Sequence, residues 1–166
     1  VIGQGAFGIT YLAHDVNLSR QVAIKEYMPA QLATRAADFT AQPISEEVTA
    51  QYQWGMQRFL NEGRLLAGIE HINIVRVLSV FEANNTAYMV MRYERGENLD
   101  NILKRHGCLE EAQVLEVLHP MLDGLEFIHR HQIIHRDIKP GNIYVREDGP
   151  PVPVSYTHLT LPTTRL

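Results

Sequence analysis

The segment that most restricts what this chain can fold into is residues 135–142, which read HRDIKPGN. It follows a stretch with helical periodicity and leads into the apolar residues 143–145. Asp137 can accept a proton from a hydroxyl, Lys139 can neutralise charge on a phosphate, and the amide oxygen of Asn142 can hold a magnesium ion. The octapeptide therefore suits the transfer of a phosphoryl group from a nucleotide to a hydroxyl.

Near the other end of the chain, residues 3–8 carry three glycines in the pattern G-x-G-x-x-G. Residues 9–13 are mostly β-branched or aromatic, so they predict a strand and make the glycines part of a hairpin. A dinucleotide-binding loop with the same pattern would instead lead into a helix. Because glycine has no side chain, such a hairpin lets the backbone close over a phosphate.

Residues 22–25 read VAIK and predict another strand, on which alternation puts Ala23 and Lys25 on one face. The alternative is a surface lysine on an edge strand. The stretch 53–68 has helical periodicity and places Glu62 on an apolar stripe with Phe59 and Leu66. A glutamate on an apolar face is costly unless it is paired, and Lys25 is a suitable partner. Three other glutamates compete for this role: Glu46, Glu47 and Glu70.

These segments resemble the eukaryotic-like (Hanks-type) serine/threonine protein kinases of bacteria. HRDxKPxN is similar to the catalytic loop of that family, and a lysine two residues after the aspartate is typical of its Ser/Thr branch. The glycine hairpin and the VAIK strand are similar to its ATP-binding segments. Residues 71–75 (HINIV) resemble HPNIV, with Ile72 in place of proline. Residues 25–29 (KEYMP) fit the K-E-Y-x-P of bacterial members and indicate a bacterial source.

The resemblance implies an α+β, protein-kinase-like fold with a β-rich small lobe and the first, mostly helical part of the large lobe. We expect the small lobe at residues 1–91, with an incomplete first strand and an inserted loop at 29–54. A hinge is expected at 92–97 and a partial large lobe at 98–152.

The resemblance also implies ATP and Mg²⁺ as cofactors and a protein as the phosphate acceptor. Lys25 and Glu62 would set the phosphates, Asp137 would be the base and Lys139 the electrophilic stabiliser, with Asn142 as metal ligand. Met91 would back the adenine, whose edge would meet the carbonyl of Arg92 and the N–H of Glu94. Glu97 either binds the ribose or is a solvated turn residue. The expected nucleotide-binding residues are Ile2, Gly3, Gln4, Gly5, Ala6, Phe7, Gly8, Thr10 (usually valine), Ala23, Lys25, Met91, Arg92 (usually glutamate), Glu94 and Glu97.

Two helices are predicted after the hinge. Asn98 can cap a short helix that runs through Lys104. A long helix is expected at residues 110–130, and Pro120 should bend it rather than end it. Its apolar residues recur at helical spacing and predict a core face: Val114, Leu118, Met121, Leu125 and Ile128.

Composition sets bounds on the class of protein. The chain has 166 residues, of which 45% are hydrophobic, and a net charge of −4, which argues against a nucleic-acid partner. It contains no run of eighteen apolar residues that would span a membrane. A single cysteine, Cys108, cannot form an internal disulfide and favours the reducing cytoplasm. His129, His131 and His135 raise the alternative of a zinc site, but no cysteine lies nearby.

The resemblance ends near residue 152, because no D-F-G follows. Residues 154–164 instead resemble a translation of the adapter used in transposase-based sequencing libraries. We expect residues 153–166 to be a non-native tail and the chain by itself to be an inactive fragment. The alternatives are a nucleotide-binding pseudokinase or scaffold with a natural tail, and a small-molecule phosphotransferase with a kinase-like fold. The latter generally lacks a Lys-Pro pair after the aspartate.

Overall fold

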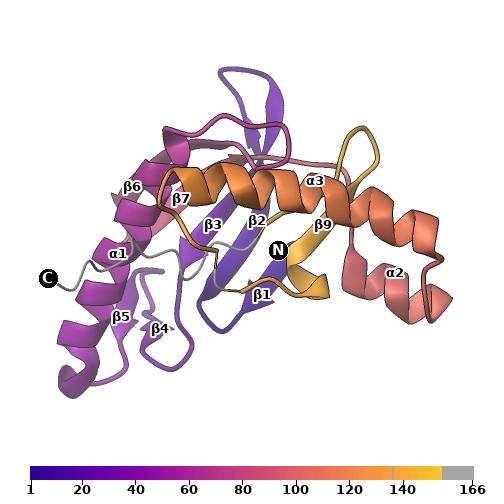
Figure 1. Ribbon diagram of the computed structural model, residues 1–166. Coiled ribbons are helices and arrows are strands. Elements are labelled where there is room, and N and C mark those ends of the chain that lie inside the picture. Colours follow the sequence, from indigo (N-terminus) through magenta and orange to yellow (C-terminus); the bar gives the residue numbers. More distant parts are fainter. Residues whose placement is uncertain (136, 155–166) are drawn as a thin grey trace, which may run out of the picture. The chain divides into compact units, whose positions relative to one another are not determined.

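A computed structural model describes residues 1–135 and 137–154 of the chain (Figure 1). Its residues form two compact units. Unit 1 consists of Val1–Ile69 and Arg76–Tyr93, and unit 2 of Glu70–Val75 together with the described residues from Glu94 onward. Arg136 and residues 155–166 lie outside the described part, as does most of the tail expected at 153–166.

Unit 1 is built on a five-stranded sheet of order β1-β2-β3-β7-β6, in which all neighbours are antiparallel. The strands are β1 (Gly3–Gly5), β2 (Gly8–Asp15), β3 (Arg20–Tyr27), β6 (Val77–Ala83) and β7 (Thr86–Arg92). The strands predicted at residues 9–13 and 22–25 are confirmed. Their β-branched and aromatic side chains suit a pleated, half-buried surface.

Helix α1 (Thr49–Ala67) packs against β6 and β7 of this sheet, beside which it lies in Figure 1. It begins four residues before the predicted position 53. Gly63 faces the sheet so closely that a Cβ there would collide with Val80 and crowd Met89. The buried residues of the helix include Tyr52, Phe59, Leu60, Glu62 and Leu66, so the predicted apolar stripe is confirmed.

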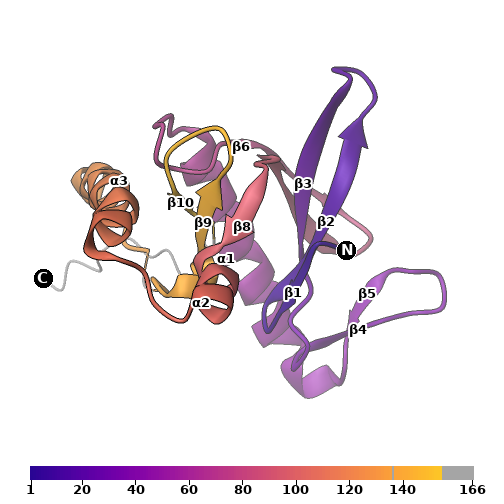
Figure 2. The same ribbon diagram turned by 90° about the vertical axis from the view of Figure 1, so that its right-hand side faces the viewer.

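The segment expected to be an inserted loop at residues 29–54 has regular structure. It forms the hairpin β4 (Ala33–Arg35) and β5 (Ala41–Pro43), the short 3-10 helix η1 (Glu46–Val48) and the start of α1. Figure 2 shows the hairpin extending away from β1, β2 and β3. Backbone bonds to other parts of unit 1, such as Ala41 N–H to the Asn84 carbonyl at 2.8 Å, stabilise it. Backbone bonds between residues so far apart in the chain produce no periodic pattern in the sequence, so the hairpin was not predicted.

Unit 2 contains a three-stranded sheet of order β10-β9-β8 and two α-helices. The strands are β8 (Gly96–Asn98), β9 (Ile143–Arg146) and β10 (Val152–Pro153), and the helices are α2 (Leu99–His106) and α3 (Glu111–Arg130). Asn98 caps α2 as predicted, since its side chain accepts a bond from Asn101 N–H at 2.8 Å. Pro120 lies inside α3 and does not end it. Leu99, Met121 and Ile143 form a cluster of buried apolar residues.

The predicted core face of α3 is only partly buried. Met121 and Ile128 are buried, whereas Val114 and Leu118 are each 43% exposed. The buried face instead passes through Gly124, where the helix approaches the backbone of Asn73 too closely for a larger residue. Pro153, the first residue of the tail expected at 153–166, pairs with Ile143 in the edge strand β10, where proline is tolerated because its missing N–H faces no neighbouring strand.

Within the described residues, none of the helices combines the length and the apolar character needed to cross a lipid bilayer.

We expect Leu60→Ala to lower the free energy of unfolding by about 2–5 kcal/mol, because Leu60 is 1% exposed and truncation leaves a cavity. Leu65 lies on the same helix and is 42% exposed, so Leu65→Ala is the matched control and should cost less than about 1 kcal/mol. Urea denaturation of both variants measures the difference. Equal losses would show that Leu60 does not pack into the core of unit 1.

Candidate active site

The predicted glycine hairpin is present in unit 1. Gly3 pairs with Thr10 and Gly5 with Gly8, so Ala6 and Phe7 form the turn between β1 and β2. The glycines meet different surroundings. A Cβ on Gly8 would collide with the backbone carbonyl of Glu26, whereas one on Gly5 would have no neighbour within 4 Å. Gly8 is therefore required by the fold, and Gly5 leaves its surface open to a ligand.

The turn of the hairpin is bonded to the chain that follows β3. Met28 N–H donates to the Phe7 carbonyl at 3.2 Å, and Ala30 N–H donates to the Ala6 carbonyl at 3.3 Å. No pattern in the sequence indicates these bonds.

Lys25 lies in the middle of the sheet, between Thr10 of β2 and Met89 of β7. Ala23, two residues earlier, has Met91 as its partner on β7. Directly paired residues project to the same face of a sheet, so Thr10, Ala23, Lys25 and Met91 share one face. The shared face inferred for Ala23 and Lys25 thus also includes residues of the neighbouring strands β2 and β7. Because β3 lies between these two strands, Lys25 is not on an edge strand.

Glu62 is the buried carboxylate among the four candidates, with 7% of its surface exposed. Glu46 and Glu47 are exposed in η1, and Glu70 is exposed in unit 2. Glu62 and Lys25 both belong to unit 1. Their pairing stays a prediction, and burial favours Glu62 for it because a buried carboxylate needs a compensating partner.

The segment predicted as a hinge divides between the units. Arg92 ends β7 with an exposed side chain, and its N–H donates to the Arg76 carbonyl at 2.9 Å. Glu94 begins the second part of unit 2, where its carboxylate lies 3.7 Å from Nη1 of Arg146. Contacts of this backbone with adenine stay a prediction.

Glu97 is held by an arginine that the sequence did not indicate. Arg105 of α2 binds both carboxylate oxygens, with Nη1–Oε1 at 3.0 Å and Nη2–Oε2 at 2.6 Å. Such a bidentate pair fixes the orientation of the carboxylate. Glu97 thus lies in β8 with its carboxylate oriented by Arg105, and its role in binding ribose stays a prediction.

In unit 2 the polar residues of the octapeptide 135–142 meet around the carboxylate of Asp137. Nζ of Lys139 lies 3.0 Å from Oδ1, and Nδ2 of Asn142 donates to Oδ2 at 2.7 Å and to the backbone carbonyl of Asp137 at 2.9 Å. Nδ1 of the buried His135 accepts from the Asp137 N–H at 3.3 Å. The short helix η2 (Pro140–Asn142) turns Asn142 back toward Asp137. The structure thus brings together the three residues predicted from the octapeptide.

The Asp137 carboxylate is held in its ionised form. Burial alone would raise its pKa, but hydrogen bonds from Lys139 and Asn142 outweigh burial and hold the pKa below the ordinary value of 3.8. A lowered pKa in the folded state stabilises the fold above the pKa of the unfolded chain. This contribution is lost as the pH falls below about 3.8.

Asn142 fits the predicted role of magnesium ligand. Its amide nitrogen makes both bonds to Asp137, which leaves the amide oxygen as the atom that can ligate a cation. Among the described residues, no group of three or more histidines, cysteines and carboxylates could hold a metal ion. His129, His131 and His135 therefore form no zinc site there. His131 instead contacts the Phe127 carbonyl through Nδ1 at 2.9 Å.

Sequence reasoning also missed the partners of residues 71–75. Asn73 Nδ2 donates to Oδ2 of Asp123 on α3 at 2.7 Å, and His71 Nε2 lies 3.5 Å from the same oxygen. The His71 ring stacks on Phe127 with 4.5 Å between centroids. These contacts attach the segment to α3 although it is far away in sequence.

Comparisons with known proteins agree with these features. The protein kinase domain family matches residues 1–154. The serine/threonine-protein kinase TAO1-B of Xenopus laevis is 32% identical over 148 residues, covering 89% of this chain and 13% of that protein. The serine/threonine-protein kinase pkn2 of Myxococcus xanthus is 34% identical over 149 residues, covering 89% and 16%. This last relative supports the bacterial source indicated by residues 25–29. The chain spans less than a fifth of the length of either relative.

Two solved structures are similar over nearly the whole chain. PpkA-294 in its apo form has a TM-score of 0.88 and 37% identity, covering 93% of this chain and 56% of that one. Rad53 1–466 in complex with AMP-PNP has a TM-score of 0.72 and 25% identity, covering 94% and 36%.

We expect Lys139→Met to raise the pKa of Asp137 toward 3.8, because Lys139 is the main group that lowers it against the effect of burial. Lys104→Met, which removes an exposed ion pair with Asp100 on α2, should leave that pKa unchanged. A carboxyl ¹³C NMR titration measures both. An unchanged Asp137 midpoint in Lys139→Met would rule out the 3.0 Å ion pair as its cause.

Proposed function

Because this chain belongs to the protein kinase family, we propose that residues 1–154 take part in ATP-dependent phosphoryl transfer to serine and threonine hydroxyls of proteins. The observation that carries the proposal is the arrangement of Lys139 and Asn142 around the Asp137 carboxylate. The chain covers only part of the kinases that it matches, so the activity is proposed for the whole protein in which these residues occur.

In the proposed mechanism, Asp137 orients the hydroxyl of the acceptor and takes its proton. The carboxylate can take this role because it is ionised at neutral pH and because Lys139 and Asn142 hold it in one orientation. Lys139, 3.0 Å from Oδ1, holds its ammonium where charge on the transferred phosphoryl group would be neutralised. Asn142 fixes the carboxylate by its amide nitrogen and offers its oxygen to magnesium.

Unit 1 supplies the residues proposed to hold the nucleotide. The open surface at Gly5 allows backbone N–H groups to approach phosphate oxygens. Lys25 would bind the phosphates, with Glu62 as its partner, and Ala23 and Met91 would form the apolar bed of the adenine. Magnesium, when bound, neutralises phosphate charge and aligns the phosphates for in-line transfer.

The 166 residues contain no D-F-G, whose aspartate is a magnesium ligand in this family. We therefore propose that the chain by itself does not turn over, although the remaining residues suit nucleotide binding. A pseudokinase or scaffold is disfavoured for the whole protein because Lys25, Asp137 and Asn142 are all retained. A cytoplasmic location is proposed because ATP and protein substrates are available there.

We expect Asp137→Asn, in the product of the complete open reading frame, to slow phosphoryl transfer by about 100-fold or more, since a general base contributes about 10²–10⁴-fold. Binding of Mg·ATP should change by less than about threefold, because Asp137 acts on the acceptor hydroxyl. Asp148→Asn makes the same change at an exposed position and is the control. Radiolabelled ATP measures transfer, and wild-type transfer by Asp137→Asn would refute the assignment of the base.

We expect Lys25→Met and Glu62→Gln to be strongly non-additive, because each should remove the same ion pair. Their double-mutant cycle is measured as kcat/KM for ATP. The cycle of Lys25→Met with Glu47→Gln is the control, because Glu47 is exposed in η1. If the effects of Lys25→Met and Glu62→Gln simply add, Glu62 is not the partner of Lys25.

A further inference from the structure

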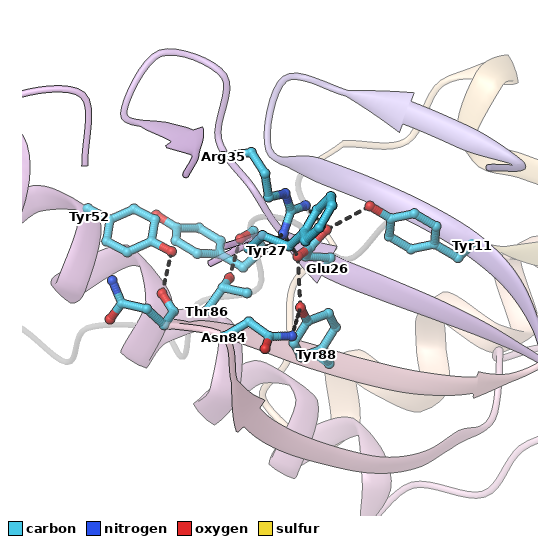
Figure 3. A network of polar contacts seen from close by, with 10 residues as sticks. Tyr11, Glu26, Tyr27, Arg35, Tyr52, Asn84, Thr86 and Tyr88 are labelled. Atoms are coloured by element: carbon cyan, nitrogen blue, oxygen red, sulfur yellow. Dashed lines mark hydrogen bonds and ion pairs between the residues drawn. The ribbon is translucent and has the colours of Figure 1, made fainter. Parts of the chain in front are cut away.

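Glu26 follows the predicted nucleotide-binding lysine on β3 and is 1% exposed. Its two carboxylate oxygens receive four hydrogen bonds (Figure 3). Arg35 of β4 donates from Nη1 at 2.8 Å and from Nη2 at 2.6 Å, Tyr11 donates at 2.8 Å and Tyr88 at 2.9 Å. We call these four residues the Glu26 network. Its members come from four different strands, β2, β3, β4 and β7.

The network keeps an ionised carboxylate inside the protein. Burial raises the pKa of Glu26, but the bonds from Arg35, Tyr11 and Tyr88 outweigh burial and lower it below the ordinary value of 4.5. A buried ion pair is weak evidence for stability, since apolar residues often stabilise a core equally well. The network instead fixes the orientation of the Glu26 side chain, because the forked guanidinium and the two phenol groups can all donate to the carboxylate in only one placement.

The position of the network relates it to Lys25. Consecutive residues of a strand project to opposite faces, so Glu26 lies on the face of the sheet opposite Lys25. Tyr11 follows Thr10, and Tyr88 precedes Met89; Thr10 and Met89 are the cross-strand partners of Lys25. The bonds to Glu26 therefore hold β2, β3 and β7 together next to Lys25 and its two cross-strand partners.

The same network closes a ring that includes the glycine turn. Between Glu26 and Arg35, Met28 N–H binds the Phe7 carbonyl and Ala30 N–H binds the Ala6 carbonyl. Because Arg35 is bonded back to Glu26, this stretch of chain is fixed at both ends and in its middle. Displacement of Arg35 would thus also release the turn of the phosphate-binding hairpin.

We propose that Glu26 and Arg35 are positioning residues of the nucleotide site, which hold Lys25 and the glycine turn in place for the phosphates of ATP. This role rests on the function proposed above. It assigns a task to the β4–β5 hairpin, namely to deliver Arg35 to the face of the sheet that the nucleotide does not contact. A purely structural role would affect the whole site, whereas positioning acts on the phosphate-binding part.

The experiment separates these roles by comparing Mg·ATP with adenosine, which lacks phosphates. It uses the product of the complete open reading frame and isothermal titration calorimetry below the unfolding temperature. For Arg35→Met, we expect the Kd for Mg·ATP to rise about tenfold and the Kd for adenosine to change less than about twofold. Arg35→Lys keeps the charge without the fork and should recover part of the affinity for Mg·ATP.

Arg20→Met is the matched control, because Arg20 lies on β3, the strand of Glu26, and forms an exposed ion pair with Asp15 at 3.6 Å. It should leave both affinities unchanged. If Arg35→Met is too unstable to purify, Tyr11→Phe and Tyr88→Phe each remove one bond and keep the ion pair. Both should show a smaller loss with the same selectivity for Mg·ATP.

Proportional loss of both ligands, or no loss of either, would overturn the positioning role while leaving the proposed function intact. Failure of the wild-type protein to bind Mg·ATP would overturn the proposed function and this inference with it.

Discussion

Strand β3 carries a lysine and a glutamate in succession, and a strand must send them to opposite faces of its sheet. Each charge therefore needs partners of its own, and both sets of partners must be in place together. On one side, Glu26 is satisfied by Arg35, Tyr11 and Tyr88, at distances of 2.6–2.9 Å. On the other, Lys25 lies between Thr10 and Met89 in the register of the sheet, and Glu62 is its predicted partner. The β4–β5 hairpin of unit 1 meets part of this requirement, because it carries Arg35, which binds Glu26.

The segment of unit 2 that is proposed to be catalytic depends on a different kind of interaction. Asp137, Lys139 and Asn142 lie within six residues of one another, and a single 3-10 turn is enough to bring their polar atoms into contact. Both Asp137 and Glu26 have a lowered pKa, but Glu26 depends on residues far away in sequence. A change in the local chain would disturb Asp137, whereas a shift between strands would disturb Glu26.

The similarity to known kinases accounts for the sequence motifs, but not for the arginine side chains that orient carboxylates beside them. The family match covers residues 1–154, and the similarity to PpkA-294 extends over 93% of the chain. Two arginines act as supports here, Arg35 for Glu26 and Arg105 for Glu97, and both bind their carboxylates with two bonds. Bidentate arginine contacts impose one orientation on a carboxylate. In the nucleotide site proposed above, such contacts would orient the site without altering the residues proposed to contact the nucleotide.

The sequence by itself determined the strands around residues 9–13 and 22–25, the cap at Asn98 and the cluster around Asp137. These features depend on alternation, capping and short spacing, which are local properties of the chain. Only the tertiary structure decided that the inserted segment forms a hairpin, that Arg35 meets Glu26, and that Val114 and Leu118 of α3 are exposed. The physical reason is that burial and long-range pairing depend on which other surface lies opposite, and a periodic pattern does not encode that surface.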